Sequence, residues 1–148
     1  MKFQTAKISI ISACLFGQKC RFDGKSKQLP DLDNYKKDCK LLPVCPEVLG
    51  GLGVPRLKAW IKSGTGKDVL EGNAKVINEN GEDVTDNFIK GAYKTLDLAL
   101  ANGVRKAILK SRSPSCGVGQ VHNVDKLVNG NGVTAELLIE NGIEVIVV

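Results

Sequence analysis

The stretch DVTDNFIKGAYKTLDLALANGVRKAILK, residues 83–110, places a helical pattern directly before a short strand pattern. In its first part, apolar residues recur three and four positions apart, after an N-cap candidate in Asp83 or Thr85 and before a stop at Asn102-Gly103. Residues 106–110 then form a short apolar run, which is typical of a strand covered on both faces of a parallel sheet. A helix that leads into a buried strand is part of a β-α-β unit, so this stretch predicts an α/β fold.

Three more apolar runs of the same kind occur along the chain, at residues 7–13, 39–44 and 143–148. A second, smaller helical pattern at residues 132–142 precedes the last of them. We therefore predict a single three-layer, Rossmann-like domain over residues 1–148, with a small parallel sheet, right-handed crossovers and the strand order 2-1-3-4.

The remaining segments have a weaker pattern. Residues 31–39 are expected to form a short connection or helix between the first two strands. An amphipathic turn is expected near Trp60, and two Gly/Asn turn signals favour an extra hairpin in which residues 67–72 pair with residues 74–81.

The composition is that of an ordinary globular domain, with 148 residues, 43% hydrophobic and 25% charged. The formal net charge is +5, but no basic run is longer than two residues, so we expect a solvated surface and no nucleic-acid interface. The N-terminal apolar part is too short to span a bilayer, which predicts a cytoplasmic protein without membrane contact. Thiols stay reduced in that compartment, so a disulfide framework among the five cysteines is not expected.

Three of the cysteines, Cys14, Cys45 and Cys116, each follow a predicted strand. The carboxyl ends of parallel strands meet at one edge of a sheet, so we expect the three sulfur atoms on the order of 6 to 7 Å apart. Each cysteine lies in a turn sequence (ACLFG, PVCPE, SPSCG), which is less typical of a thiol that only fills a core. Cys20 and Cys39 are interpreted as non-ligands, with Cys20 placed near the same edge.

The spacing of the cysteines restricts the chemistry of such a site. No C-x-x-C pair occurs, which argues against a zinc ribbon and a thioredoxin-like site. Three cysteines can hold a 4Fe-4S cluster by three irons and leave the fourth open, as catalysis requires. Two other hypotheses are a non-catalytic cluster carrier with Cys20 as fourth ligand, and an α/β module that binds an anionic small molecule through Lys110 and Arg56.

Six motifs in this order span nearly the whole chain: SACLFG (12–17), CRFDG (20–24), VCPEVLGGLGVPR (44–56), GEDVTDNFIKGA (81–92), AILKSRSPSCG (107–117) and GNGVTAELLIENGIEV (130–145). With them the sequence resembles the thiouracil desulfidase family of small iron-sulfur domains. CPExxGGLxxPR and SPSCG are its most specific parts. The resemblance implies a cytosolic enzyme that uses a 4Fe-4S cluster to remove sulfur from a thiolated pyrimidine without net redox change.

Carried over position by position, the resemblance implies that the three strand-end cysteines bind the cluster and that Glu47 and Ser113 form the polar pair of the active site. Glu47 would activate water or move a proton, and Ser113 would position the water or the substrate. Ser115 is the competing candidate for Ser113, because it adjoins Cys116. The expected substrate is a small thiolated base such as 2-thiouracil, in preference to thiolated tRNA.

Three further polar residues are interpreted without a catalytic role. His122 is the only histidine, and we expect it in a surface loop. Arg56 and Asp23 are expected at the rim of the site.

Overall fold

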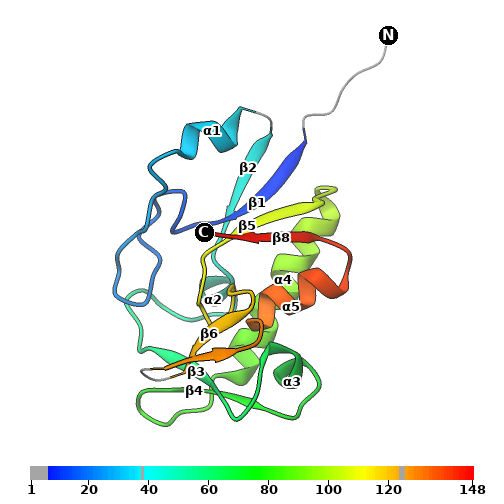
Figure 1. The fold of residues 1–148 in the computed structure, drawn as a ribbon. Coiled ribbons are helices and arrows are strands. Elements are labelled where there is room, and N and C mark those ends of the chain that lie inside the picture. Colours follow the sequence, from blue (N-terminus) through cyan, green and yellow to red (C-terminus); the bar gives the residue numbers. More distant parts are fainter. Residues whose placement is uncertain (1–6, 38, 124–125) are drawn as a thin grey trace.

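The computed structural model describes residues 7–37, 39–123 and 126–148. A four-stranded sheet lies at its centre, built from β1 (Ile8–Ser12), β2 (Lys40–Val44), β5 (Lys106–Leu109) and β8 (Glu144–Val147) (Figure 1). The strands follow the order β2-β1-β5-β8, and each neighbouring pair is parallel. The parallel sheet and the strand order predicted from the sequence are therefore confirmed.

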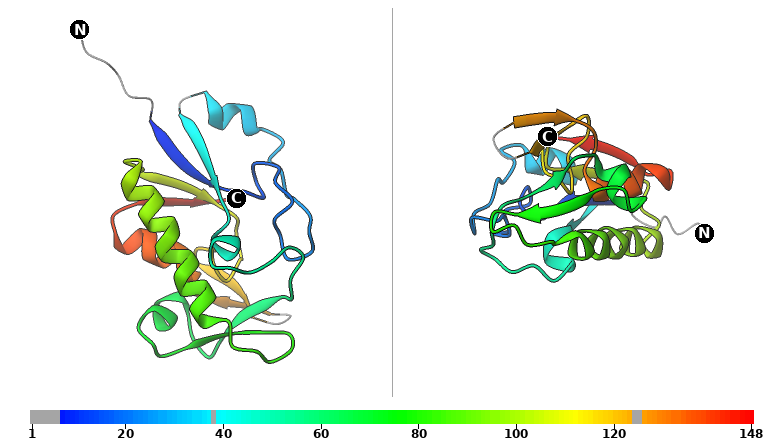
Figure 2. Two further views of the ribbon diagram at one scale, coloured as in Figure 1. Left: turned by 180° about the vertical axis from the view of Figure 1, so that it is seen from behind. Right: turned by 90° about the horizontal axis from the view of Figure 1, so that it is seen from below.

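Alternate residues of the strands face two different layers. On one face, Ile10, Ala107 and Leu109 pack in a core with α4 (Thr85–Ala101) and α5 (Val133–Glu140), which lie side by side in Figure 2. On the other face, Ile11 and Ile108 pack with the loop after β1 and with α1 (Leu32–Lys36), the short helix expected between the first two strands. The domain thus has the three predicted layers.

The long helix α4 begins and ends close to the predicted residues. Val84 occupies the N-cap position, so neither Asp83 nor Thr85 is the cap. Both side chains nevertheless accept backbone hydrogen bonds. Asp83 Oδ1 accepts the Thr85 N–H at the start of the helix at 2.9 Å, and Thr85 Oγ1 accepts the Val76 N–H at 2.9 Å. The helix ends at Ala101, before the predicted stop.

The short helix α2 (Pro46–Leu49) packs against α4 through two glycines. A side chain on Gly91 would collide with the carbonyl oxygen of Pro46, and one on Gly50 would collide with the carbonyl oxygen of Asn87. The Asn87 side-chain amide also donates to the Gly50 carbonyl at 2.8 Å. These backbone contacts fix the turn that follows β2 against the long helix.

The extra hairpin exists, but its first strand differs from the prediction. β3 (Ala59–Lys62) pairs antiparallel with β4 (Lys75–Asn78), so Trp60 lies in a strand and not in an amphipathic turn. Residues 67–72 lie mainly in α3 (Gly66–Leu70). The reason is a helix cap: the Asp68 carboxylate accepts the backbone N–H of Thr65 at 2.8 Å.

A second hairpin, not predicted from the sequence, follows the cysteine-containing turn. It consists of β6 (Gln120–Asn123) and β7 (Lys126–Asn129), which pair antiparallel. His122 is exposed, as expected, but it lies on a strand and not in a loop. Its backbone N–H donates to the Arg112 carbonyl at 2.8 Å, which ties the hairpin to the segment after β5. No helix in the described ranges is long and apolar enough to cross a membrane.

Candidate active site

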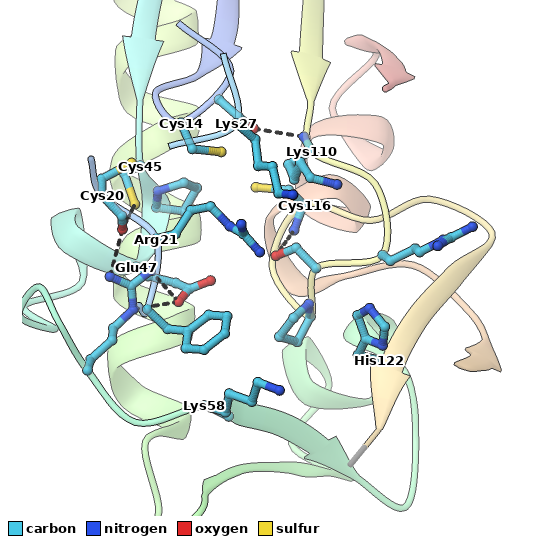
Figure 3. A pocket seen from close by; sticks show the side chains of 18 of the residues that line it. Cys14, Cys20, Arg21, Lys27, Cys45, Glu47, Lys58, Lys110, Cys116 and His122 are labelled. Atoms are coloured by element: carbon cyan, nitrogen blue, oxygen red, sulfur yellow. Dashed lines mark hydrogen bonds and ion pairs between the residues drawn. The ribbon is translucent and has the colours of Figure 1, made fainter. Parts of the chain in front are cut away.

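A cavity of about 580 Å³ lies beyond the carboxyl ends of β1, β2 and β5 (Figure 3). The chain runs from β1 to β2 on one side and then to β5 on the other, so the strand order reverses between β1 and β5. Open α/β sheets commonly bind ligands at the carboxyl ends of the strands at such a point. Cys14, Cys45, Cys116, Glu47 and Ser113 all line it. The structure therefore brings together the five residues that the sequence analysis selected.

The three strand-end cysteines differ in burial and acidity. Cys14 and Cys116 are buried, and Cys45 is partly buried at the N-cap position of α2. Burial raises the pKa of Cys116 to about 12. Hydrogen bonding with the Cys20 thiol lowers the pKa of Cys14 and also that of Cys45, which falls to about 7.

The two remaining cysteines occupy different places. Cys20 lines the cavity, where hydrogen bonds with Cys14 and Cys45 raise the pKa of its own thiol. Cys39 lies outside the lining: its thiol donates to the Tyr35 carbonyl at 3.3 Å, and it packs against the core on the α1 face of the sheet. The sequence predicts both as non-ligands and Cys20 near the edge of the sheet, and in the structure Cys20 is indeed the one that lies close to the other thiols.

The SPSCG turn presents one of its serines to the cavity and buries another. Ser113 Oγ accepts the backbone N–H groups of Ser115 and Cys116 at 3.1 and 3.2 Å, so its hydroxyl proton can serve a partner in the cavity. Ser115 is 1% exposed and shares a 2.8 Å hydrogen bond with Thr134 of α5. The geometry therefore favours Ser113 over Ser115 as the active-site hydroxyl.

The same turn is held by the start of α5. Its carbonyl oxygens at Pro114, Ser115 and Gly117 accept backbone N–H groups from residues 132–135 at 2.8 to 3.0 Å. A side chain on Gly132 would collide with the Ser115 carbonyl group. This close backbone contact sets the position of Cys116 and Ser113 relative to the helix.

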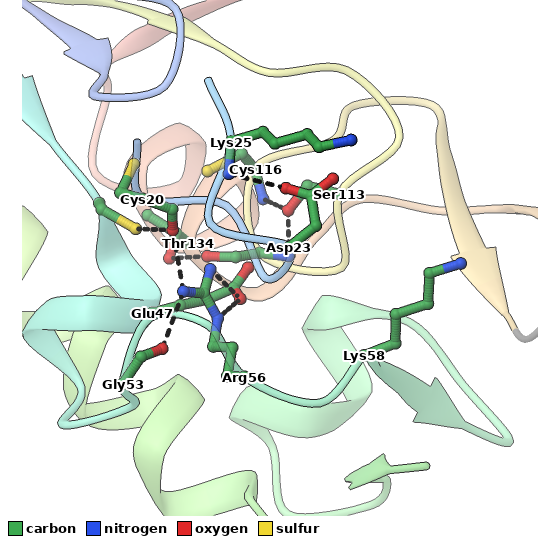
Figure 4. Close-up of polar contacts among 12 residues, drawn as sticks. Cys20, Asp23, Lys25, Glu47, Gly53, Arg56, Lys58, Ser113, Cys116 and Thr134 are labelled. Atoms are coloured by element: carbon green, nitrogen blue, oxygen red, sulfur yellow. Dashed lines mark hydrogen bonds and ion pairs between the residues drawn. The ribbon is translucent and has the colours of Figure 1, made fainter. Parts of the chain in front are cut away.

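Glu47 is paired with Arg56 (Figure 4). Arg56 Nε and Nη2 both lie 2.8 Å from Glu47 Oε2, while Nη1 donates to the carbonyl oxygens of Cys20 and Gly53 at 2.8 and 3.2 Å. Arg56 was expected at the rim without a catalytic role, and in the structure it is the partner of the predicted acid or base. Asp23 is exposed and lies outside the cavity lining.

Basic side chains dominate among the charged residues of the lining. Six of the lining residues are basic and one, Glu47, is acidic; the basic ones are Arg21, Lys27, Arg56, Lys58, Lys110 and Arg112. They come from three separate segments, so no basic run in the sequence predicts that they line one cavity. His122 also lines the cavity, where desolvation and the charges of Arg112 and Lys58 lower its pKa.

Comparison with known proteins assigns the class of the chain. Residues 9–148 match the family model described as 2-thiouracil desulfurase, and the chain belongs to this family. It is 42% identical over 140 residues to YbbK of Bacillus subtilis (strain 168), described as an uncharacterized protein, and the match covers 93% of each chain. It also resembles the solved structure of a 4Fe-4S-dependent thiouracil desulfidase, TudS, with a TM-score of 0.83, 40% identity, and coverage of 95% of this chain and 90% of that one. The family resemblance drawn from the sequence motifs is thus confirmed.

Proposed function

We propose that this protein removes sulfur from a thiolated pyrimidine by hydrolysis, giving the oxo base and sulfide. The observation that carries the proposal is the single cavity in which three strand-end cysteines meet Glu47 and Ser113. Membership of the 2-thiouracil desulfurase family and the likeness to TudS support the same reaction. Water supplies the oxygen of the new carbonyl group and both protons that leave with the sulfide, so no electrons are gained or lost.

The donor set in the cavity fits a 4Fe-4S cluster bound by Cys14, Cys45 and Cys116. Within the described ranges, no group of three His, Cys, Asp or Glu side chains is placed to hold a single metal ion. A cubane cluster binds each cysteine through a different iron, so it suits thiols that surround a cavity. Hydrogen bonding with Cys20 and the charges of Arg21 and Lys110 lower the pKa of Cys14, which favours the thiolate that iron requires.

The polar residues of the cavity have complementary tasks in this hydrolysis. When bound through three cysteines, the cluster supplies one iron without a protein ligand, a soft Lewis acid suited to a thiocarbonyl sulfur. Glu47 takes a proton from the water that attacks the thiocarbonyl carbon, and returns it to the sulfur as the C–S bond breaks. The second proton of the water leaves the new hydroxyl group as the carbonyl group forms. The hydroxyl group of Ser113 donates a hydrogen bond that orients that water or the substrate ring.

The cavity also bears on the choice of substrate. A volume of about 580 Å³ suits a small molecule such as a thiolated base or a derivative of it, and suits thiolated tRNA less well. The basic lining favours a substrate that carries negative charge. It would also suit the anionic ligand of the binding-module hypothesis.

The test is anaerobic reconstitution with iron and sulfide, followed by a sulfide-release assay. Free sulfide should appear in equal amount to the oxo base with 2-thiouracil or 4-thiouracil, and more slowly with thiolated tRNA. A reconstituted protein that is brown but releases sulfide from none of the three would refute the proposal. A colourless protein that still binds an anionic base would support the binding module instead.

The cluster carrier is kept as a second candidate function because Cys20 lies in the cavity with the other three thiols. A fourth cysteine ligand would close the open iron and remove the Lewis acid. Iron content after replacement of Cys20 separates the two functions.

A further inference from the structure

We propose that Arg56 is a positioning residue for the carboxylate of Glu47, an inference that rests on the proposed function because it assumes that Glu47 moves a proton. Two of the Arg56 donors, on Nε and Nη2, reach the same oxygen, Glu47 Oε2, at 2.8 Å. In the part of the chain that the structure describes, Oε1 has no hydrogen-bond partner. The pair therefore leaves one carboxylate oxygen for water or substrate.

Arg56 is itself held by groups on three sides (Figure 4). Its Nη1 donates to the carbonyl oxygens of Cys20 and Gly53, and its backbone N–H donates to the Phe22 carbonyl at 2.8 Å. The side chain is only 9% exposed, so these bonds are largely shielded from water. Arg56 thus connects the loop at residues 20–22 to α2 and to the turn after it.

A guanidinium group is required for this arrangement. Its five N–H donors point in fixed directions in one plane, so it can serve one carboxylate oxygen and two carbonyl oxygens together. The ammonium group of lysine is a single point of charge and cannot span the three acceptors. Without Arg56, the Glu47 carboxylate would rotate freely, and a misplaced general base loses about a hundredfold in rate.

The experiment compares Arg56→Ala and Arg56→Lys with the wild type, all reconstituted anaerobically. Both variants should keep normal iron content. We expect Arg56→Ala to lower kcat about a hundredfold with KM changed less than about threefold. The kcat of Arg56→Lys should be less than about tenfold higher than that of Arg56→Ala. Added guanidinium ion should restore about tenfold of the Arg56→Ala loss, because it refills the vacated site. Arg105→Ala, an exposed arginine outside the cavity, is the matched control.

A second measurement does not depend on activity. Amide hydrogen exchange of residues 20–22 and 53–56 should be faster in both variants than in the wild type, and unchanged in Arg105→Ala. If the wild type releases no sulfide, the proposed function fails, and the exchange data alone still test the contacts of Arg56. A normal kcat, a rise of KM alone, or unchanged exchange would each overturn the inference; if Arg56→Ala does not fold, Arg56→Lys decides it.

Discussion

Replacing Glu47 by glutamine should separate proton transfer from cluster binding. The glutamine amide oxygen can accept the Arg56 donors that now reach Oε2 at 2.8 Å, so the shape of the site is kept. The two side chains are only 9% and 19% exposed, so leaving the Arg56 charge without its anionic partner should lower the free energy of unfolding by about 3 kcal/mol. The amide nitrogen in the place of Oε1 cannot take a proton from water. Loss of a positioned acid or base slows a reaction by about 10²- to 10⁴-fold, or at least about 2.7 kcal/mol of barrier.

The assay is the initial rate of sulfide release by the reconstituted Glu47→Gln protein at saturating 4-thiouracil, with iron content and visible absorption measured on the same sample. We expect normal iron and colour with a rate at least about a hundred times lower. Glu140→Gln, an exposed carboxylate on α5, serves as the control. A near wild-type rate would remove Glu47 from the mechanism. Loss of iron together with activity would assign the carboxylate to cluster binding.

Three other predictions test the cysteine assignment, the hydroxyl group and the packing behind the site. Cys20→Ser should leave the iron content unchanged while Cys45→Ser lowers it sharply; equal losses in an iron assay would mean a fourth protein ligand and favour the carrier. Ser113→Ala should slow sulfide release about tenfold with normal iron, as expected for one lost hydrogen bond, and an unchanged rate would exclude its hydroxyl from the reaction. Gly91→Ala should lower the free energy of unfolding in urea by about 1–3 kcal/mol, because its new methyl group meets a backbone carbonyl, whereas exposed Lys90→Ala should change it by no more than about 0.5 kcal/mol. Equal effects of these two substitutions would contradict the close contact.

The sheet could be predicted from the sequence because its strands are short apolar runs without alternation, as burial on both faces demands. The hairpin at β3 and β4 could not be assigned correctly, because Val69 and Leu70 suit either a strand or a helix over so short a segment. The contact between Thr65 and Asp68 decides for the helix. The pairing of β6 with β7 was not predicted, since these two strands are short and polar.

The convergence of the cysteines on one cavity was predictable for a different reason. Once the strands are parallel and their order is known, Cys14, Cys45 and Cys116 must lie at one edge of the sheet. The partner of Glu47 was not predictable, because the position of Arg56 depends on the path of a loop with no periodic pattern. The basic lining was missed likewise, since its members are brought together by the fold alone.

The backbone contacts around the cavity also bear on how the protein acquires its cofactor. The turn at Cys45 is fixed by the approach of Gly91, and the turn at Cys116 by the start of α5 at Gly132. These contacts join main-chain atoms and do not involve the thiol groups. We therefore expect the protein to bind iron and sulfide at a site that is already folded, with little ordering of the chain. Small metal domains that fold only around their ion behave differently. The delivery of the cofactor would then depend on access through the cavity mouth and on the redox state of the thiols.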